Sequence, residues 1–291
     1  MEKVAPAELE RRVSVQEIPG KGKGLVANSH IRKGDVILKE TPVLLGFVDG
    51  VQGIRRQLNP LLLKTAVRGL PKRQQNRIDD LAVTTGGEYY EDVLRTNSFT
   101  IEIDNTKFSA LFPDIARINH DCTPNTFTRY SQSTLQMEVV AHRAIQQGEE
   151  ITITYIPQSL STGDRKALIS QRGFNCTCRL CSSDIDGQTS DRNRADIRSI
   201  LDEIRDHRDS LTPSLIRKLS QRLLQILNDE SLQIQGGEYY SLFADLYLSV
   251  GAAEDARDMA WKALESRVFY NGADSERAKK ARDMMKRVGA F

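Results

Sequence analysis

The sequence predicts an α+β protein, with a sheet-rich domain of short strands, a helical insertion within it and a C-terminal helical array. Short apolar and β-branched runs bounded by glycine turns fill residues 12–47 and 99–155. Between them, residues 54–94 alternate polar runs with apolar clusters, a pattern typical of helices. Beyond residue 190, apolar residues recur at helical spacing.

The first predicted strands are separated by turns that contain glycine. Val13 and Val15 alternate with polar neighbours, and a glycine-rich run, 19–24, separates them from the next apolar run. A second turn lies at Lys33-Gly34-Asp35. The strands predicted after these turns are Leu25-Val26-Ala27, Val36-Ile37-Leu38 and Val43-Leu44-Leu45.

The helical insertion is expected over about residues 50–98, inside a sheet-rich domain that covers residues 1–157. Strand character returns after the insertion, most clearly in the last segment, where β-branched and polar residues alternate strictly. The predicted later strands are Phe99–Ile103, Thr126–Tyr130, Leu135–Val140 and Ile151–Tyr155.

The C-terminal region, residues 186–291, is predicted to be a helical array. A small polar run, 182–190, precedes it and suits a linker. The spacing of aromatic and small residues from Tyr240 to Ala263 resembles one tetratricopeptide helix pair. One such pair is too few for a free-standing solenoid, so we expect its apolar stripes to be buried against the rest of the protein.

Composition limits the classes of partner. The 291 residues include 41 Lys and Arg against 39 Asp and Glu, a formal net charge of +2, so direct nucleic-acid binding is not expected. No apolar h-region opens the sequence and no run of 18 uncharged apolar residues occurs, which predicts neither secretion nor membrane spanning. We expect an intracellular monomer, cytoplasmic or nuclear. Lys279-Lys280 is too short for a nuclear signal.

The four cysteines predict one structural zinc site. Cys176, Cys178 and Cys181 form a C-x-C-x-x-C cluster, and Cys122 lies more than fifty residues earlier. Four thiolates suit a closed tetrahedral zinc shell, which leaves no position open for catalysis. The alternative is a set of ordinary buried cysteines, which three cysteines within six residues make the weaker interpretation.

Four motifs follow one another over about residues 12–181. They are Gly22-Lys23-Gly24-Leu25-Val26-Ala27 with Ile31–Ile37; Thr96–Phe99 with Leu111–Asn125, which contains Asn119-His120-Asp121-Cys122; Gly148–Tyr155; and Arg172–Cys181. In this order they resemble the opening glycine loop, the central signature, the strand before the catalytic tyrosine and the post-SET zinc loop of the SET-domain family.

The resemblance implies a β-rich SET fold with a post-SET zinc-binding segment at residues 158–185. It also implies S-adenosylmethionine (AdoMet) as methyl donor and the side-chain amine of lysine in a protein, histone or non-histone, as acceptor. The insertion and helical tail are most similar to SMYD-like SET proteins, and we expect the tail to roof the substrate cleft as in those proteins. The alternative is that the tail binds another protein through its concave face. The chain departs from the SMYD-like group because residues 47–111 contain no cysteine, so the MYND zinc module and its partners are not expected.

The resemblance assigns Lys23, Gly24, Asn119 and His120 to cofactor binding. Lys23 would meet the AdoMet carboxylate, Gly24 would let the main chain approach the cofactor, and the His120 main chain would read the adenine edge. The Asn119 amide can donate and accept, which suits the amino-acid end of AdoMet. The alternatives are a solvated turn lysine for Lys23 and a capped turn for Asn119.

Tyr155 is expected to be the catalytic residue, because its un-ionised hydroxyl can orient both the amine and the methyl group. Tyr155 is also expected to belong to the cofactor site. Phe174 resembles the aromatic residue that packs on adenine. Both rings also have a structural alternative. Tyr155 could be a strand-end aromatic residue that closes the core, and Phe174 could form a wall of the zinc loop. His30 and His142 stand alone, and we interpret them as surface or strand residues rather than ligands.

Two further functions stay open at this point. One is a catalytically silent, zinc-braced scaffold that binds proteins, against which the retained Tyr155, Asn119 and Gly24 argue. The other is methylation of a small molecule on the same fold, which the sequence does not separate from protein methylation.

Overall fold

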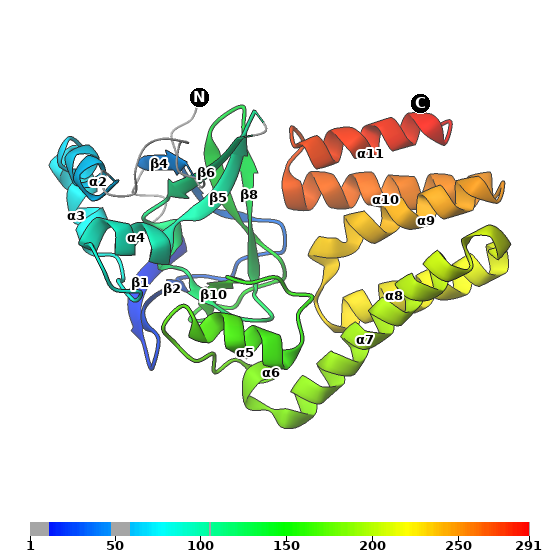
Figure 1. Cartoon of the computed structure of the whole chain (residues 1–291), viewed down its shortest axis with the longest axis horizontal. Helices are drawn as coiled ribbons and strands as arrows, with labels where there is room; N and C mark the ends of the chain where they lie inside the picture. The colour runs from blue at the N-terminus through cyan, green and yellow to red at the C-terminus, as the bar shows by residue number, and fades with distance from the viewer. Residues whose placement is uncertain (1–11, 48–58, 105, 291) are drawn as a thin grey trace. The chain divides into compact units, whose positions relative to one another are not determined.

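The computed structural model describes residues 12–47, 59–104 and 106–290 (Figure 1). The chain divides into two compact units. The first consists of Met1–Tyr155 and Ile169–Asn175, and the second of Ile156–Leu168 and Cys176–Phe291. Among the described residues, no helix has both the length and the apolar character needed to cross a membrane.

In the described part of the first unit, the strands form three small sheets, with strand orders β1-β2-β10-β7, β3-β9-β8 and β4-β6-β5. The strands are β1 (Val13–Ile18), β2 (Gly22–Ala27), β3 (Val36–Glu40), β4 (Leu44–Phe47), β5 (Phe99–Ile103), β6 (Thr106–Leu111), β7 (Asn119–His120), β8 (Thr126–Ser131), β9 (Gln136–Ala141) and β10 (Glu150–Ile153). Each strand predicted from the sequence is present, although some ends differ. The strands β6 and β7 were not predicted. β7 has only two residues, too few to display a period-two pattern, and in β6 the residues around Phe108 are polar or small, so they form no apolar run.

The hairpin of β1 and β2 shows why its turn is rich in glycine. Gly20 and Gly22 have φ angles of 73° and 70°, in the left-handed region that only glycine enters readily. After this turn, Leu25 and Val26 of β2 are buried. Leu25 belongs to the apolar cluster that also includes strand residues of β9 and β10, such as Val139 and Ile151. The core of the sheets therefore lies under the first predicted motif.

The insertion is helical, as predicted, over its described part. It consists of α2 (Asn59–Arg68), α3 (Lys72–Asp79) and α4 (Tyr89–Asn97). Val67, Ile78 and Val93, one from each helix, are buried in one cluster with Leu111 of β6. The predicted start of the insertion, residues 50–58, lies outside the described residues.

A buried carboxylate joins the insertion to the sheets. Glu40, at the end of β3, accepts hydrogen bonds from the backbone N–H groups of Asp114 and Ile115 at 3.0 Å and forms an ion pair with Arg77 of α3. The Arg77 guanidinium also lies 2.6 Å from the Asp114 carboxylate. Burial, together with the nearby Asp114 charge, raises the pKa of Glu40 to about 7.

The second unit is helical. It contains most of α5 (Thr162–Ser170) and then, in chain order, α6 (Arg179–Ser182), α7 (Asp184–Asp206), α8 (Pro213–Asp229), α9 (Gly236–Ser249), α10 (Ala253–Asn271) and α11 (Glu276–Arg287) (Figure 1). The helices α9 and α10 pack against each other. Their small and aromatic residues at the spacing read from the sequence are buried, namely Phe243, Ala244, Tyr247, Ala256, Ala260 and Ala263.

The predicted linker at residues 182–190 is wrong, because α7 begins at Asp184. The Ser183 side chain caps this helix by accepting from the N–H of Asp186, and both acidic residues of the first turn suit the positive end of the helix dipole. Position 187 favours glycine, because a Cβ there would lie only 3.1 Å from the carbonyl oxygen of Leu180. Small polar residues here serve capping and close packing.

A buried ion pair links α7 to α8 inside the second unit. The Arg194 guanidinium lies 2.5 Å from the Glu230 carboxylate, and both side chains are more than nine-tenths buried. Arg194 also donates through Nε to the carbonyl oxygen of Gln158 at 3.0 Å. This bond holds the segment around Gln158, which follows Tyr155 in the sequence, against α7.

The Glu40 network predicts a pH-dependent stability. Because its pKa is raised from 4.5 to about 7 on folding, the stabilisation from the protonated form is complete below pH 4.5 and is lost as the pH rises through 7. We expect the free energy of unfolding to fall by up to about 3 kcal/mol between pH 5 and 8, and Glu40→Gln to remove that slope. Urea unfolding at fixed pH values measures it.

Glu102→Gln is the matched control, since Glu102 is exposed on β5. That variant should keep the wild-type slope. An identical slope in wild type and Glu40→Gln would contradict the assignment of this pH dependence to Glu40.

Candidate functional site

The pairing of β7 with β10 brings three of the predicted site residues together. The two strands run parallel, with Asn119 opposite Thr152 and His120 opposite Ile153. Tyr155 follows β10 by two residues, and its backbone N–H donates to Nδ1 of His120 at 3.1 Å. The rings of His120 and Tyr155 lie 5.3 Å apart between centroids. The predicted cofactor and catalytic residues are therefore neighbours.

Asn125 holds this arrangement from inside. Its side-chain oxygen accepts from the N–H of Thr152 at 2.8 Å, and its amide nitrogen donates to the carbonyl oxygen of Glu150 at 2.8 Å. The side chain thus bonds β10 as a neighbouring strand would, and it is 2% exposed. We infer that Asn125 fixes the end of the loop that begins at Asn119.

The Tyr155 hydroxyl has a fixed direction. It donates to the carbonyl oxygen of Ile118 at 2.6 Å. Burial raises the pKa of Tyr155 to about 12, against the opposing effect of the Arg172 cation, whose guanidinium lies 5.6 Å from the ring centroid. At neutral pH the hydroxyl therefore keeps its proton, and its oxygen lone pairs remain able to accept a hydrogen bond.

Phe174 completes an aromatic corner around Tyr155. Its ring centroid lies 6.3 Å from those of both His120 and Tyr155, and it meets the Tyr155 ring edge to face at 88°. Despite these contacts, Phe174 is 37% exposed. A planar apolar group can therefore stack on its open face.

The insertion supports the chain beside Phe174. Gly173 has a φ of 87°, and a Cβ there would lie 3.1 Å from the Thr84 side chain. Thr84 belongs to a turn organised by Asp92 of α4, which accepts from the N–H groups of Thr84, Thr85 and Gly86. Although burial favours the neutral form, hydrogen bonds from Thr85 and its neighbours hold the pKa of Asp92 below its usual range.

Gly24 is required by the packing of Asn119. A Cβ on Gly24 would lie 2.6 Å from Nδ2 of Asn119 and 2.7 Å from a side-chain carbon of Ile18, too close for any real side chain. The Asn119 amide nitrogen donates to Glu150 at 2.9 Å and to the Lys23 carbonyl oxygen at 3.3 Å. Its amide oxygen makes no hydrogen bond to another described residue.

The two lysines of the glycine loop are both paired. Lys21 Nζ lies 2.7 Å from Glu150, and Lys23 Nζ lies 2.8 Å from Asp80, the residue that follows α3. The Lys23 side chain is 47% exposed. Lys23 is therefore at a surface that a soluble ligand can reach, but it meets an acidic partner of this chain there.

The residues present fit AdoMet. Its amino-acid end carries a carboxylate and an ammonium group, and this loop offers the cation of Lys23 for the first and the open amide oxygen of Asn119 for the second. The exposed ring of Phe174 suits a nucleobase.

The cysteine cluster fits zinc. The sulfur atoms of Cys122, Cys176, Cys178 and Cys181 all lie within 4.8 Å of one another. Tetrahedral zinc with sulfur at 2.3 Å has sulfur-to-sulfur separations of about 3.8 Å, so a small contraction suffices. His30 is exposed and the His142 ring contacts Phe127 at 6.5 Å between centroids; neither belongs to this cluster.

Sequence reasoning missed the acidic residues of the site. Asp80 and Asp92 come from an insertion without a readable motif, so no spacing in the sequence connects them to Lys23 or Phe174. Glu150 lies inside the Gly148–Tyr155 motif, directly before β-branched residues, and this position could have been used to place it on the strand beside Asn119. Arg172 also lies in a quoted motif, but its place over Tyr155 follows only from the fold.

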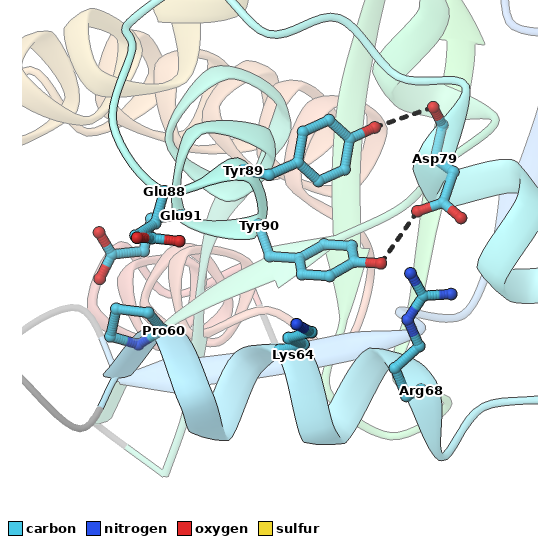
Figure 2. Close-up of a pocket in the computed structure, with 8 residues that line it drawn as sticks. All are labelled: Pro60, Lys64, Arg68, Asp79, Glu88, Tyr89, Tyr90 and Glu91. Carbon is cyan, nitrogen blue, oxygen red and sulfur yellow. Dashed lines mark hydrogen bonds between the residues drawn. The ribbon is translucent and has the colours of Figure 1, made fainter.

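A hollow of about 390 Å³ lies between α2 and α4 (Figure 2). Asp79, at the end of α3, accepts the Tyr89 hydroxyl at its carbonyl oxygen and the Tyr90 hydroxyl at its carboxylate. The other lining residues are Pro60, Lys64, Arg68, Glu88 and Glu91. None of the predicted site residues lines it.

Comparison with known proteins identifies the domain. Residues 22–156 match the family model described as "SET domain". The chain is 33% identical over 172 residues to "Histone-lysine N-methyltransferase set5" of Schizosaccharomyces pombe, covering 58% of this chain and 50% of that protein. It is 37% identical over 109 residues to "N-lysine methyltransferase SMYD2" of Homo sapiens, covering 36% and 24%.

A third relative, "Histone-lysine N-methyltransferase ATXR2" of Arabidopsis thaliana, is 38% identical over 78 residues, covering 26% of this chain and 16% of that protein. The predicted SET domain and the similarity to SMYD-like proteins are confirmed. The matched region spans half or less of the length of these curated relatives.

Proposed function

We propose, from the SET domain that residues 22–156 form, that this protein is an AdoMet-dependent methyltransferase acting on the side-chain amine of lysine in a protein. The observation that carries the proposal is the parallel pairing of β7 with β10, which puts Asn119 and His120 beside Tyr155. The relatives are named as lysine methyltransferases, which supports the same choice of acceptor.

The proposed chemistry depends on alignment. AdoMet supplies a methyl group on a positively charged sulfur, and transfer of that group is an in-line displacement in which positioning is the largest demand. The hydroxyl of Tyr155 is fixed by the carbonyl oxygen of Ile118, so its lone pairs have a defined direction. They orient the acceptor amine and attract the polarised methyl group.

The acceptor ammonium must lose its proton before it attacks. An apolar, desolvated position lowers the pKa of a lysine, and His120, Phe174 and Tyr155 supply aromatic surroundings for it. The Arg172 cation over the Tyr155 ring acts in the same direction, because a neighbouring positive charge disfavours the ammonium form.

We also propose that the four cysteines hold one structural zinc, and that the chain is organised as a SET domain at 1–157, a post-SET segment at 158–185 and a helical region at 186–291. The acceptor is a protein or peptide in the cytoplasm or nucleus, and the helical region contributes to its selection. The near-neutral charge balance of the chain supports a partner other than nucleic acid.

The zinc proposal makes a direct prediction. Purified wild type should carry one zinc per chain, measured by elemental analysis, and Cys178→Ser should lower both the zinc content and the midpoint of thermal unfolding, since three ligands close the shell less well. Ser182→Ala is the control, because the Ser182 hydroxyl lies near the cluster, donates to the carbonyl oxygen of Thr177 and is not one of the four sulfur groups. Wild-type protein without zinc would refute this part of the proposal.

The catalytic proposal predicts a separation of rate from binding. Tyr155→Phe should lower methyl transfer from radiolabelled AdoMet to core histones and to a lysine peptide array by roughly 10²-fold. Its AdoMet affinity should change little, because only one hydroxyl is removed. Tyr130→Phe, which deletes a buried hydroxyl without a hydrogen-bond partner among the described residues, should keep wild-type activity. Equal rates for Tyr155→Phe and wild type would rule out the role of Tyr155.

Cofactor binding is tested without knowledge of the acceptor. Calorimetry should give one AdoMet site in the wild type, and Asn119→Ala should weaken it by at least about tenfold, because both the amide oxygen and the packing on Gly24 are lost. A folded, zinc-loaded wild type that does not bind AdoMet would favour the silent protein-binding scaffold. Binding with transfer only to metabolites would favour a small-molecule acceptor.

A further inference from the structure

Two cations of the first unit converge on one carboxylate of the insertion. Lys23 Nζ lies 2.8 Å from Oδ1 of Asp80, and Arg117 Nη2 lies 2.9 Å from Oδ2. Lys23 comes from β2 and Arg117 from the short helix two residues before Asn119. Each carboxylate oxygen of Asp80 thus has its own cation.

The backbone position of Asp80 is set by the insertion. Its backbone N–H donates to the carbonyl oxygen of Asn76 at 3.1 Å and ends α3. The preceding residue, Asp79, receives the Tyr89 hydroxyl at 2.9 Å and the Tyr90 hydroxyl at 3.1 Å, as Figure 2 shows. The Asp80 backbone is anchored in this way, and its carboxylate keeps the Arg117 contact when Lys23 leaves.

The two cations differ in how firmly they are held. The Arg117 side chain is only 12% exposed, whereas that of Lys23 is 47% exposed and sits on a flexible four-carbon stem. Exposed ion pairs contribute little to stability. Lys23 can therefore leave Asp80 at small cost, while Arg117 keeps the carboxylate neutralised. Hydrogen bonding from Lys23, with the charge of Arg117, holds the pKa of Asp80 below its ordinary value, so it is a carboxylate at neutral pH.

We propose that Asp80 competes with the carboxylate of AdoMet for the Lys23 cation. The insertion thus presents a carboxylate to the same cation that the carboxylate of the cofactor requires. This inference rests on the proposed function and takes Lys23 as the residue that meets the cofactor carboxylate. The Lys23 carbonyl oxygen is already bonded by Asn119, so the loop that carries the lysine is part of the cofactor site. A helical insertion without a sequence motif then sets the cofactor affinity.

The sign of the effect distinguishes this proposal from a supporting role. If Asp80 competes, Asp80→Asn removes both the competing partner and a like charge, and AdoMet should bind about three- to fivefold more tightly. If Asp80 merely orients Lys23, the same variant should bind AdoMet more weakly. Isothermal calorimetry on the full chain measures either outcome, and thermal unfolding checks that the variant is folded.

Asp79→Asn is the matched control. It removes the same charge one residue away, from a carboxylate that faces Tyr90 and not Lys23, and its side-chain oxygen can still accept the Tyr90 hydroxyl. A general charge effect would therefore appear in both variants, whereas local competition should appear only in Asp80→Asn.

The second probe is 5′-methylthioadenosine, which lacks the amino-acid end of AdoMet and hence the carboxylate. Its affinity should be the same for wild type and Asp80→Asn. An unchanged or weaker affinity of Asp80→Asn for AdoMet, or an equal gain for both probes, would overturn the competition. Failure of the folded wild type to bind either probe would overturn the proposed function itself, and this inference with it.

Discussion

The candidate site depends on a two-residue strand being held in a sheet. The parallel pair of β7 with β10 has only two residue pairs, too few to be stable by backbone bonds alone. The side chain of Asn125 supplies the missing bonds to Glu150 and Thr152 from a fully buried position. Because the Asn125 side chain makes the bonds that a neighbouring strand would make, the loop between Asn119 and Asn125 has a fixed path, and Cys122 within it has a fixed place.

Much of the sheet region could be predicted from the sequence because its signals are local. Glycines with positive φ, such as Gly20 and Gly22, mark the first turn, and short β-branched runs mark the strands that follow. The predicted site residues Asn119, His120, Tyr155 and Phe174 came from ordered motifs. The structure brings the rings of His120, Tyr155 and Phe174 within contact distance of one another and places Asn119 next to His120 in β7. The polar stretch before α7 was misinterpreted because small polar residues serve equally as linkers and as helix caps.

The contacts that could not be predicted share one physical origin. They join the helical insertion to the motifs through buried or ion-paired carboxylates: Glu40 meets Arg77, Asp80 meets Lys23, and Asp92 organises the turn that packs on Gly173. A carboxylate can accept several bonds from any direction, so it imposes no period or spacing on the sequence. Such contacts become visible only when the fold brings distant segments together.

These three carboxylates have different protonation behaviour, and the difference follows from what surrounds each. Glu40 is buried near another acid, which raises its pKa, whereas Asp92 receives several N–H and O–H donors and Asp80 two cations, which lower theirs. The insertion therefore contributes two permanent negative charges, Asp80 and Asp92, and its Arg77 meets a protonatable carboxylate, Glu40 of β3. Since the two permanent charges face the glycine loop and the turn beside Phe174, the insertion acts on the electrostatics of the candidate site and not only on its shape.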